Sequence, residues 1–119
     1  MYKNYQMKIA IATNDRITIA ERTGRAAEFA FYTIKSKEIE SVVYQKNNHK
    51  HHGHGGHGHN HEHGEHSHKD IVLQLQGVDV FLVRAIGKNM RRDLKEGNIP
   101  YQLVKIDAIS EILADYLKN

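Results

Sequence analysis

Cysteine is absent from the 119-residue chain, which excludes disulfides, cysteine-bound zinc and iron–sulfur clusters held by thiolates of this chain. Tryptophan is also absent, and the basic residues form no run interleaved with aromatic side chains, which argues against a nucleic-acid surface. The net charge of +3 still suits an anionic partner. Any metal would therefore be bound by histidine, carboxylate or backbone groups.

Long apolar runs are also absent, because no segment approaches the ~20 residues that cross a bilayer. The N-terminal residues lack the apolar core and cleavage site of a signal peptide. We therefore expect a cytoplasmic protein without membrane contact. The chain length matches one domain, which we expect over residues 7–117, with residues 1–6 as a loose N-terminal extension.

All ten histidines lie in one twenty-residue tract, HKHHGHGGHGHNHEHGEHSH. The tract holds five glycines and no aliphatic residue, so we expect residues 47–68 to form a disordered loop inserted within the domain. Neutral imidazole binds zinc, copper, nickel and iron. The predicted metal ligands are His49, His51, His52, His54, His57, His59, His61, His63, His66 and His68.

Outside the tract, apolar and β-branched segments predict strands at residues 7–13, 28–35, 38–45, 78–83 and 100–106, with a further short strand at 17–19. Helical spacing of apolar residues predicts helices at 69–76, 87–96 and 108–119. We expect a two-residue hairpin turn at 36–37, a glycine cap at Gly77 and an N-cap at Asp107.

This order predicts an α/β fold with a mixed five-stranded sheet. Right-handed crossovers make the first, fourth and fifth strands parallel neighbours, and the hairpin makes the second strand antiparallel to the first. The predicted strand order is 3-2-1-4-5. In this order the loops at residues 14–27 and 84–88, together with the histidine tract, leave one edge of the sheet, where open α/β sheets bind ligands.

Several arginines and glycines in these loops indicate an anion-binding mouth. A glycine at the start of a helix allows close approach to backbone N–H groups, which favour negative charge. The alternative is an ordinary β–α turn with solvated arginines. The predicted cofactor-binding residues are Arg22, Gly24, Arg25, Arg84, Gly87 and Lys88.

The segments MKIAIAT, TGRAAEFAFYTI, a loop rich in glycine and histidine, and GVDVFLVRAIGKNM follow one another in this order. Together they resemble the dinitrogenase iron–molybdenum cofactor biosynthesis family, which includes NifX, NafY and the C-terminal domain of NifB. The resemblance covers roughly residues 7–116 and implies a ribonuclease H-like, three-layer α/β/α fold. The family's usual His-Phe-Gly-Arg is replaced by Arg22-Thr23-Gly24-Arg25, so this loop offers no imidazole.

We expect no catalytic residues, because no paired carboxylates converge, no G-x-S-x-G is present and no histidine lies outside the tract. The resemblance implies a carrier for an iron–sulfur or iron–molybdenum cluster or its precursor, with a cluster-assembly protein as partner. Two alternatives stay open. One is a buffer or chaperone for nickel, zinc, copper or cobalt ions, and the other is a protein-interaction module in which metal binding is incidental.

Overall fold

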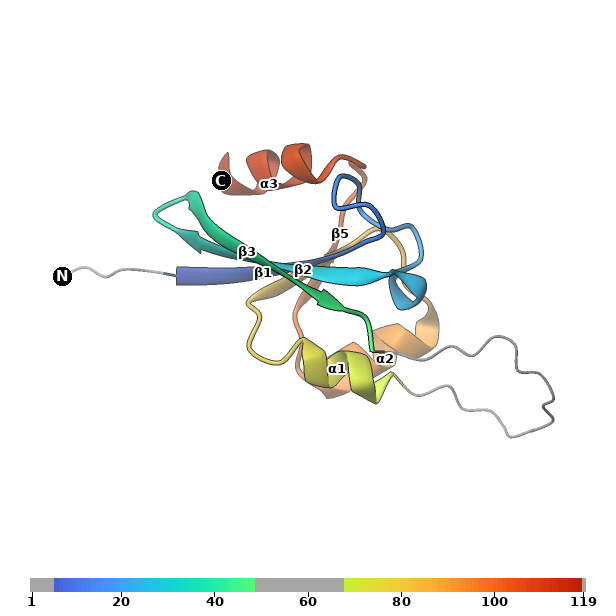
Figure 1. The fold of residues 1–119 in the computed structure, drawn as a ribbon. Helices are drawn as coiled ribbons and strands as arrows, with labels where there is room; N and C mark the ends of the chain where they lie inside the picture. Colours follow the sequence, from blue (N-terminus) through green and yellow to red (C-terminus); the bar gives the residue numbers. More distant parts are fainter. Residues whose placement is uncertain (1–5, 49–67, 119) are drawn as a thin grey trace, which may run out of the picture.

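The computed structural model describes residues 6–48 and 68–118 (Figure 1). Nine of the ten predicted histidine ligands, all except His68, lie outside the described residues. The predicted N-terminal extension also lies outside them, apart from Gln6, which belongs to the first strand. The elements are β1 Gln6–Thr13, η1 Thr23–Arg25, β2 Glu28–Lys35, β3 Glu38–Lys46, α1 Lys69–Gln74, β4 Val80–Val83, α2 Lys88–Glu96, β5 Tyr101–Leu103 and α3 Ile109–Lys118.

The five strands form one mixed sheet of order β3-β2-β1-β4-β5, which confirms the predicted order. β1 pairs antiparallel with β2 and parallel with β4, and β4 pairs parallel with β5. Figure 1 shows α3 on one face of the sheet and α1 and α2 on the other. The fold is therefore a three-layer α/β/α arrangement, as the resemblance implied.

The central strand β1 supplies side chains to both hydrophobic cores, because successive residues of a strand point to opposite faces. Ile9 and Ile11 belong to the core under α3, whereas Ala10 and Ala12 belong to the core under α1 and α2. All four are at most 1% exposed. The small alanines leave room on their face for the rings of Phe29 and Phe81, which meet edge to face at 5.9 Å.

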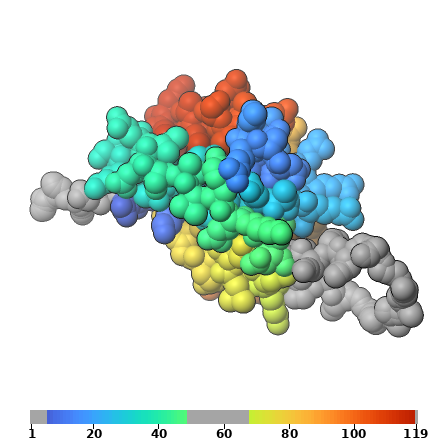
Figure 2. Space-filling view, viewed as in Figure 1, coloured from blue at the N-terminus to red at the C-terminus, as the bar shows by residue number. Residues whose placement is uncertain are grey.

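The predicted hairpin turn is present, since Ser36 and Lys37 both adopt left-handed backbone angles, with φ of 54° and 65°. Such angles at both central residues match the right-handed twist of the flanking strands. β2 and β3 then pair antiparallel along their whole length, with a register shift between Thr33 and Ile34. Figure 2 shows β3, in green, crossing the front of the molecule with α3 above it and α1 below.

Several predicted boundaries were wrong. β4 begins at Val80 instead of residue 78, and residues 17–19 form only isolated bridges in place of the predicted short strand. The last strand covers only Tyr101–Leu103, although Val104 makes one further bond to Val83 before the chain leaves the sheet. α1 ends at Gln74 with Leu75 as its C-cap, although Gly77 does take a left-handed φ of 91°. Asp107 does not cap α3, since its carboxylate binds Arg84 and α3 begins two residues later.

None of the helices within the described ranges is long and apolar enough to cross a membrane.

Gly97, the C-cap of α2, lies close against Val72 of α1. A Cβ atom placed there would lie 2.5 Å from Val72 Cγ1 and 3.3 Å from the Asp93 carbonyl. We expect Gly97→Ala to lower the free energy of unfolding by about 1–3 kcal/mol through overpacking, measured by urea denaturation followed by circular dichroism. Gly24→Ala is the control, because its Cβ would meet only Met90 Cε, at an ordinary contact distance of 3.5 Å. Equal stability of both variants would contradict the packing argument.

Candidate functional site

The loops that follow β1 and β4 meet at one edge of the sheet. The hydroxyl of Thr23, which is 2% exposed, donates to the carbonyl of Ala85 at 3.2 Å and so joins the two loops. The first loop is also closed on itself, because the Ala27 N–H donates to Asn14 Oδ1 at 2.8 Å. The predicted convergence of these loops is therefore present.

Both described flanks of the histidine tract lie at the same edge. On one side, the Asn47 side chain donates to the Ala26 carbonyl at 2.9 Å, and its backbone N–H donates to the Ala27 carbonyl at 3.0 Å. The next residue, Asn48, donates its N–H to Gln74 Oε1 of α1 at 3.0 Å. On the other side, His68 is the N-cap residue of α1. The tract therefore leaves and re-enters the fold beside the two loops.

A pocket of about 840 Å³ opens between these segments, a size typical of small-ligand sites. We call it the mouth pocket. Three segments contribute to it, namely η1 with the residues before it, the β4–α2 connection with the first turn of α2, and the residue at the start of α1. Its lining residues are Glu21, Arg22, Thr23, Gly24, Arg25, His68, Ala85, Ile86, Gly87, Lys88, Asn89 and Met90.

Five of the six predicted cofactor-binding residues line the mouth pocket, and Arg84 is the exception. The Arg84 guanidinium donates to the carboxylate of Asp107 and, at 3.5 Å, to the Lys105 carbonyl. By contrast, Arg22, Arg25 and Lys88 are exposed, and within residues 6–48 and 68–118 none of the three forms an ion pair. The mouth pocket therefore has an excess of positive charge.

A side chain at either glycine of the pocket would occupy open space and would not clash with neighbouring atoms. A Cβ at Gly87 would meet no atom within 4 Å, and one at Gly24 would touch only Met90 Cε, at 3.5 Å. Gly87 is also the N-cap residue of the nine-residue helix α2 and supplies no side-chain cap. The first backbone N–H groups of α2 therefore point toward this side of the molecule without a capping side chain.

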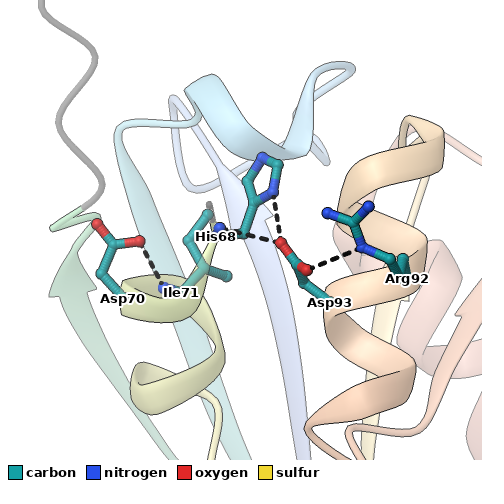
Figure 3. Close-up of polar contacts among 5 residues, drawn as sticks. All are labelled: His68, Asp70, Ile71, Arg92 and Asp93. Carbon is teal, nitrogen blue, oxygen red and sulfur yellow. Dashed lines mark hydrogen bonds and ion pairs between the residues drawn. The ribbon is translucent and has the colours of Figure 1, made fainter. Parts of the chain in front are cut away.

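His68 and Asp93 form a contact between the start of α1 and the middle of α2 (Figure 3). The backbone N–H of His68 donates to Asp93 Oδ2 at 3.0 Å, and Nδ1 of its ring lies 3.2 Å from the same oxygen. Burial acts to raise the pKa of Asp93, but the hydrogen bonds from His68 and the nearby charge of Arg92 outweigh it and lower this pKa. Asp93 is therefore ionised at neutral pH.

Other carboxylates of this edge are held by local partners. Glu28 accepts two bonds of 2.8 Å from the Arg16 guanidinium, which lies 4.0 Å from the centre of the Tyr44 ring. The Arg16 side chain lowers the pKa of Glu28 in spite of opposing desolvation. Asp15 accepts bonds from the backbone N–H groups of Thr18 at 2.7 Å and Ile17 at 2.9 Å. Asp15 and Glu28 line a separate pocket and are absent from the lining of the mouth pocket.

Among the described residues, no group of three or more histidine, aspartate or glutamate side chains is arranged to hold a metal ion. His68 is the one predicted metal ligand whose position is described, and it lines the mouth pocket. Sequence reasoning did not identify Asp93, which lies three residues after the inward-facing Met90 and one before Leu94. This position at the border of the buried helix face is the signal that could have indicated a partly buried carboxylate.

Known proteins with the same fold resemble this chain over nearly its whole length. A family model described as dinitrogenase iron-molybdenum cofactor matches residues 6–119. A dinitrogenase-like protein from Methanocaldococcus jannaschii is 16% identical, with a TM-score of 0.66, and the match covers 96% of this chain and 90% of that one. A NifB-like protein from Thermotoga is 18% identical with a TM-score of 0.63, and the match covers 95% of this chain and 89% of that one. PH0822 is 16% identical with a TM-score of 0.70, and the match covers 94% of this chain and 91% of that one. No curated protein gives a significant match.

The Asp15 turn gives a pH-dependent prediction. The backbone hydrogen bonds from Thr18 and Ile17 favour the carboxylate form and lower the pKa of Asp15. As the pH falls, the turn should therefore persist through the ordinary aspartate range and open only when the pH falls through the lowered pKa. We expect the amide NMR shifts of Ile17 and Thr18 to titrate with a midpoint below that of an unstructured aspartate. Asp15→Asn should remove this titration, whereas a midpoint at or above the ordinary range would contradict the proposed cause.

Proposed function

We propose that this chain, which belongs to the dinitrogenase iron-molybdenum cofactor family, is a non-catalytic carrier of an anionic metal cluster. The cargo is an iron–sulfur or iron–molybdenum cluster or a precursor of one, bound at the mouth pocket. The histidine tract acts as a capture arm for metal at the same edge. A cluster-assembly protein supplies or receives the cargo.

The observation that carries this proposal is the charge of the mouth pocket. Arg22, Arg25 and Lys88 line it without an ion-pair partner among the described residues, and Glu21 is the single acid in the lining. Exposed cations that converge on one concave surface raise the local concentration of anions and speed their association. Clusters built from iron, sulfide and thiolate carry net negative charge, so they match this surface.

The set of donors also fits a cluster better than a bare cation. A divalent ion held by protein alone needs three or four ligands, and the described residues offer no such group. Each iron of a cluster needs a terminal ligand in addition to the bridging sulfides, so a cluster that carries its own thiolate ligands needs few protein ligands. The described part of the pocket therefore favours cargo that is already assembled.

The ten histidines of the tract favour a second candidate, a buffer or chaperone for nickel, zinc, copper or cobalt ions. In this case the fold only displays the tract, and the mouth pocket has no ligand of its own. The carrier would bind its cargo at the mouth pocket, whereas the buffer would bind metal ions at the histidine tract. Substitutions in one place or the other therefore separate the two functions.

A non-catalytic role agrees with the positions of the acids. Two-metal hydrolysis needs carboxylates that converge on shared ions. At this edge, however, Asp15 binds its own turn, Glu28 binds Arg16, and Asp93 binds His68. These three carboxylates are therefore directed at neighbouring side-chain or backbone groups, away from a common centre.

Charge removal tests the mouth pocket. We expect the triple variant Arg22→Gln, Arg25→Gln, Lys88→Gln to bind a synthetic [4Fe–4S] dianion with four thiolate ligands about 3- to 150-fold more weakly, because exposed charges contribute about 0.2–1 kcal/mol each. Binding is measured by anaerobic titration of the cluster absorbance at two salt concentrations.

The matched control is Arg91→Gln, which removes one charge from an exposed position of α2 outside the pocket lining. It should bind the cluster as the parent does. If the triple variant binds with the affinity of the parent at low salt, the mouth pocket is not the anion site.

A second experiment separates carrier from buffer. Replacing the nine histidines from His49 to His66 with Gln removes the tract's imidazoles and retains His68. A carrier should keep most of its affinity for the [4Fe–4S] dianion while losing nickel and zinc binding. A buffer should lose all metal binding, and this result would overturn the carrier function.

A further inference from the structure

His68 is the histidine whose position the structure describes, at the start of α1. Its carbonyl accepts the N–H groups of Ile71 and Val72 at 3.0 Å, so the residue begins α1. Its side chain is 14% exposed, and that of Asp93 is 13% exposed. In Figure 3 the ring stands between α1 and α2, with one nitrogen toward Asp93 and the other on the opposite side of the ring.

The contact with Asp93 selects one form of the imidazole. An ionised carboxylate only accepts hydrogen bonds, so Nδ1 must carry the proton that points at Asp93 Oδ2, 3.2 Å away. In the neutral ring Nε2 then holds the lone pair. Histidines that bind metals commonly donate their other N–H to a carboxylate in this way, and this partner fixes both tautomer and ring orientation.

We propose that His68 is the fixed protein ligand of the cluster cargo in the mouth pocket and that Asp93 is its positioning residue. The inference rests on the proposed carrier function and identifies the protein atom that binds the cluster. His68 and the cations Arg22, Arg25 and Lys88 line the same pocket. The cations attract the anionic cluster, and His68 Nε2 binds one iron.

The binding step is a ligand exchange without change of oxidation state. Nε2 donates its lone pair to one iron and forms an Fe–N bond, while the Fe–S bond to one exogenous thiolate breaks. The thiolate leaves with its electron pair and takes a proton from solvent. A dianionic cluster becomes a monoanion, and the step reverses when thiolate is added.

A different explanation is that the His68–Asp93 contact only anchors α1 against α2. Such a structural role predicts a loss of stability in variants of either residue and no magnetic interaction between the ring and the cluster. The two explanations therefore differ in a spectroscopic measurement that stability does not affect.

The test uses the full chain with His49 to His66 replaced by Gln, so that His68 is the one histidine left. The protein is labelled with 15N-histidine, loaded anaerobically with the synthetic thiolate-ligated [4Fe–4S] cluster and reduced. Pulsed electron paramagnetic resonance should show a 15N hyperfine coupling to the cluster, and His68→Gln should abolish it. A bound cluster without this coupling would overturn the inference and leave the carrier function intact. A chain that binds no cluster would instead overturn the carrier function.

Asp93→Asn tests the positioning role. Long-range 1H–15N NMR of the metal-free chain should show the Nδ1–H tautomer in the parent and a shift toward Nε2–H in the variant, with about ten- to hundredfold weaker cluster binding. The matched control Asp70→Asn removes the same charge from α1, where Asp70 accepts a bond from the Ile71 N–H, and should change neither readout. An unchanged tautomer and affinity in Asp93→Asn would show that Asp93 has no positioning role. The hyperfine measurement retains Asp93 and remains decisive if this variant folds poorly.

Discussion

The central strand β1 is buried on both faces, and its two neighbours determine where the chain can present a site. Ile9 and Ile11 pack under α3, and Ala10 and Ala12 pack under α1 and α2, so β1 cannot shift by one residue without reversing both cores. Because β4 runs parallel to β1, the carboxyl ends of the two strands reach the same edge. The mouth pocket is formed by the loops that begin there, and its position follows from this register.

This dependence explains why the strand order and the meeting of the two loops could be predicted from the sequence. The hairpin between β2 and β3 and the right-handed crossovers leave few orders for five strands, and the apolar pattern of each strand fixes which residues face inward. The same topology places loops 14–27 and 84–87 together. Five of the six predicted residues consequently line one pocket, although their roles stay predictions.

The pairing of individual charged groups could not be predicted in the same way. Arg84 was assigned to the mouth from its place after β4, but a residue at a strand end can turn toward either neighbouring loop. Here its guanidinium meets Asp107, which sequence reasoning had assigned to the cap of α3. The His68–Asp93 contact could not be predicted either, because the two residues are 25 positions apart in the sequence and meet only because α1 lies beside α2.

These pairings together determine the electrostatics of the edge. Asp15, Glu28, Asp93 and Asp107 each accept hydrogen bonds from a nearby backbone or side-chain donor. None of these four acids lines the mouth pocket, where three cations outnumber the single acid Glu21. Exposed cations interact weakly in high dielectric and are screened by salt, so they favour rapid capture over permanent retention. A single imidazole with a fixed tautomer would orient the cluster in the mouth pocket through one bond. Such a combination suits cargo that must later leave the protein.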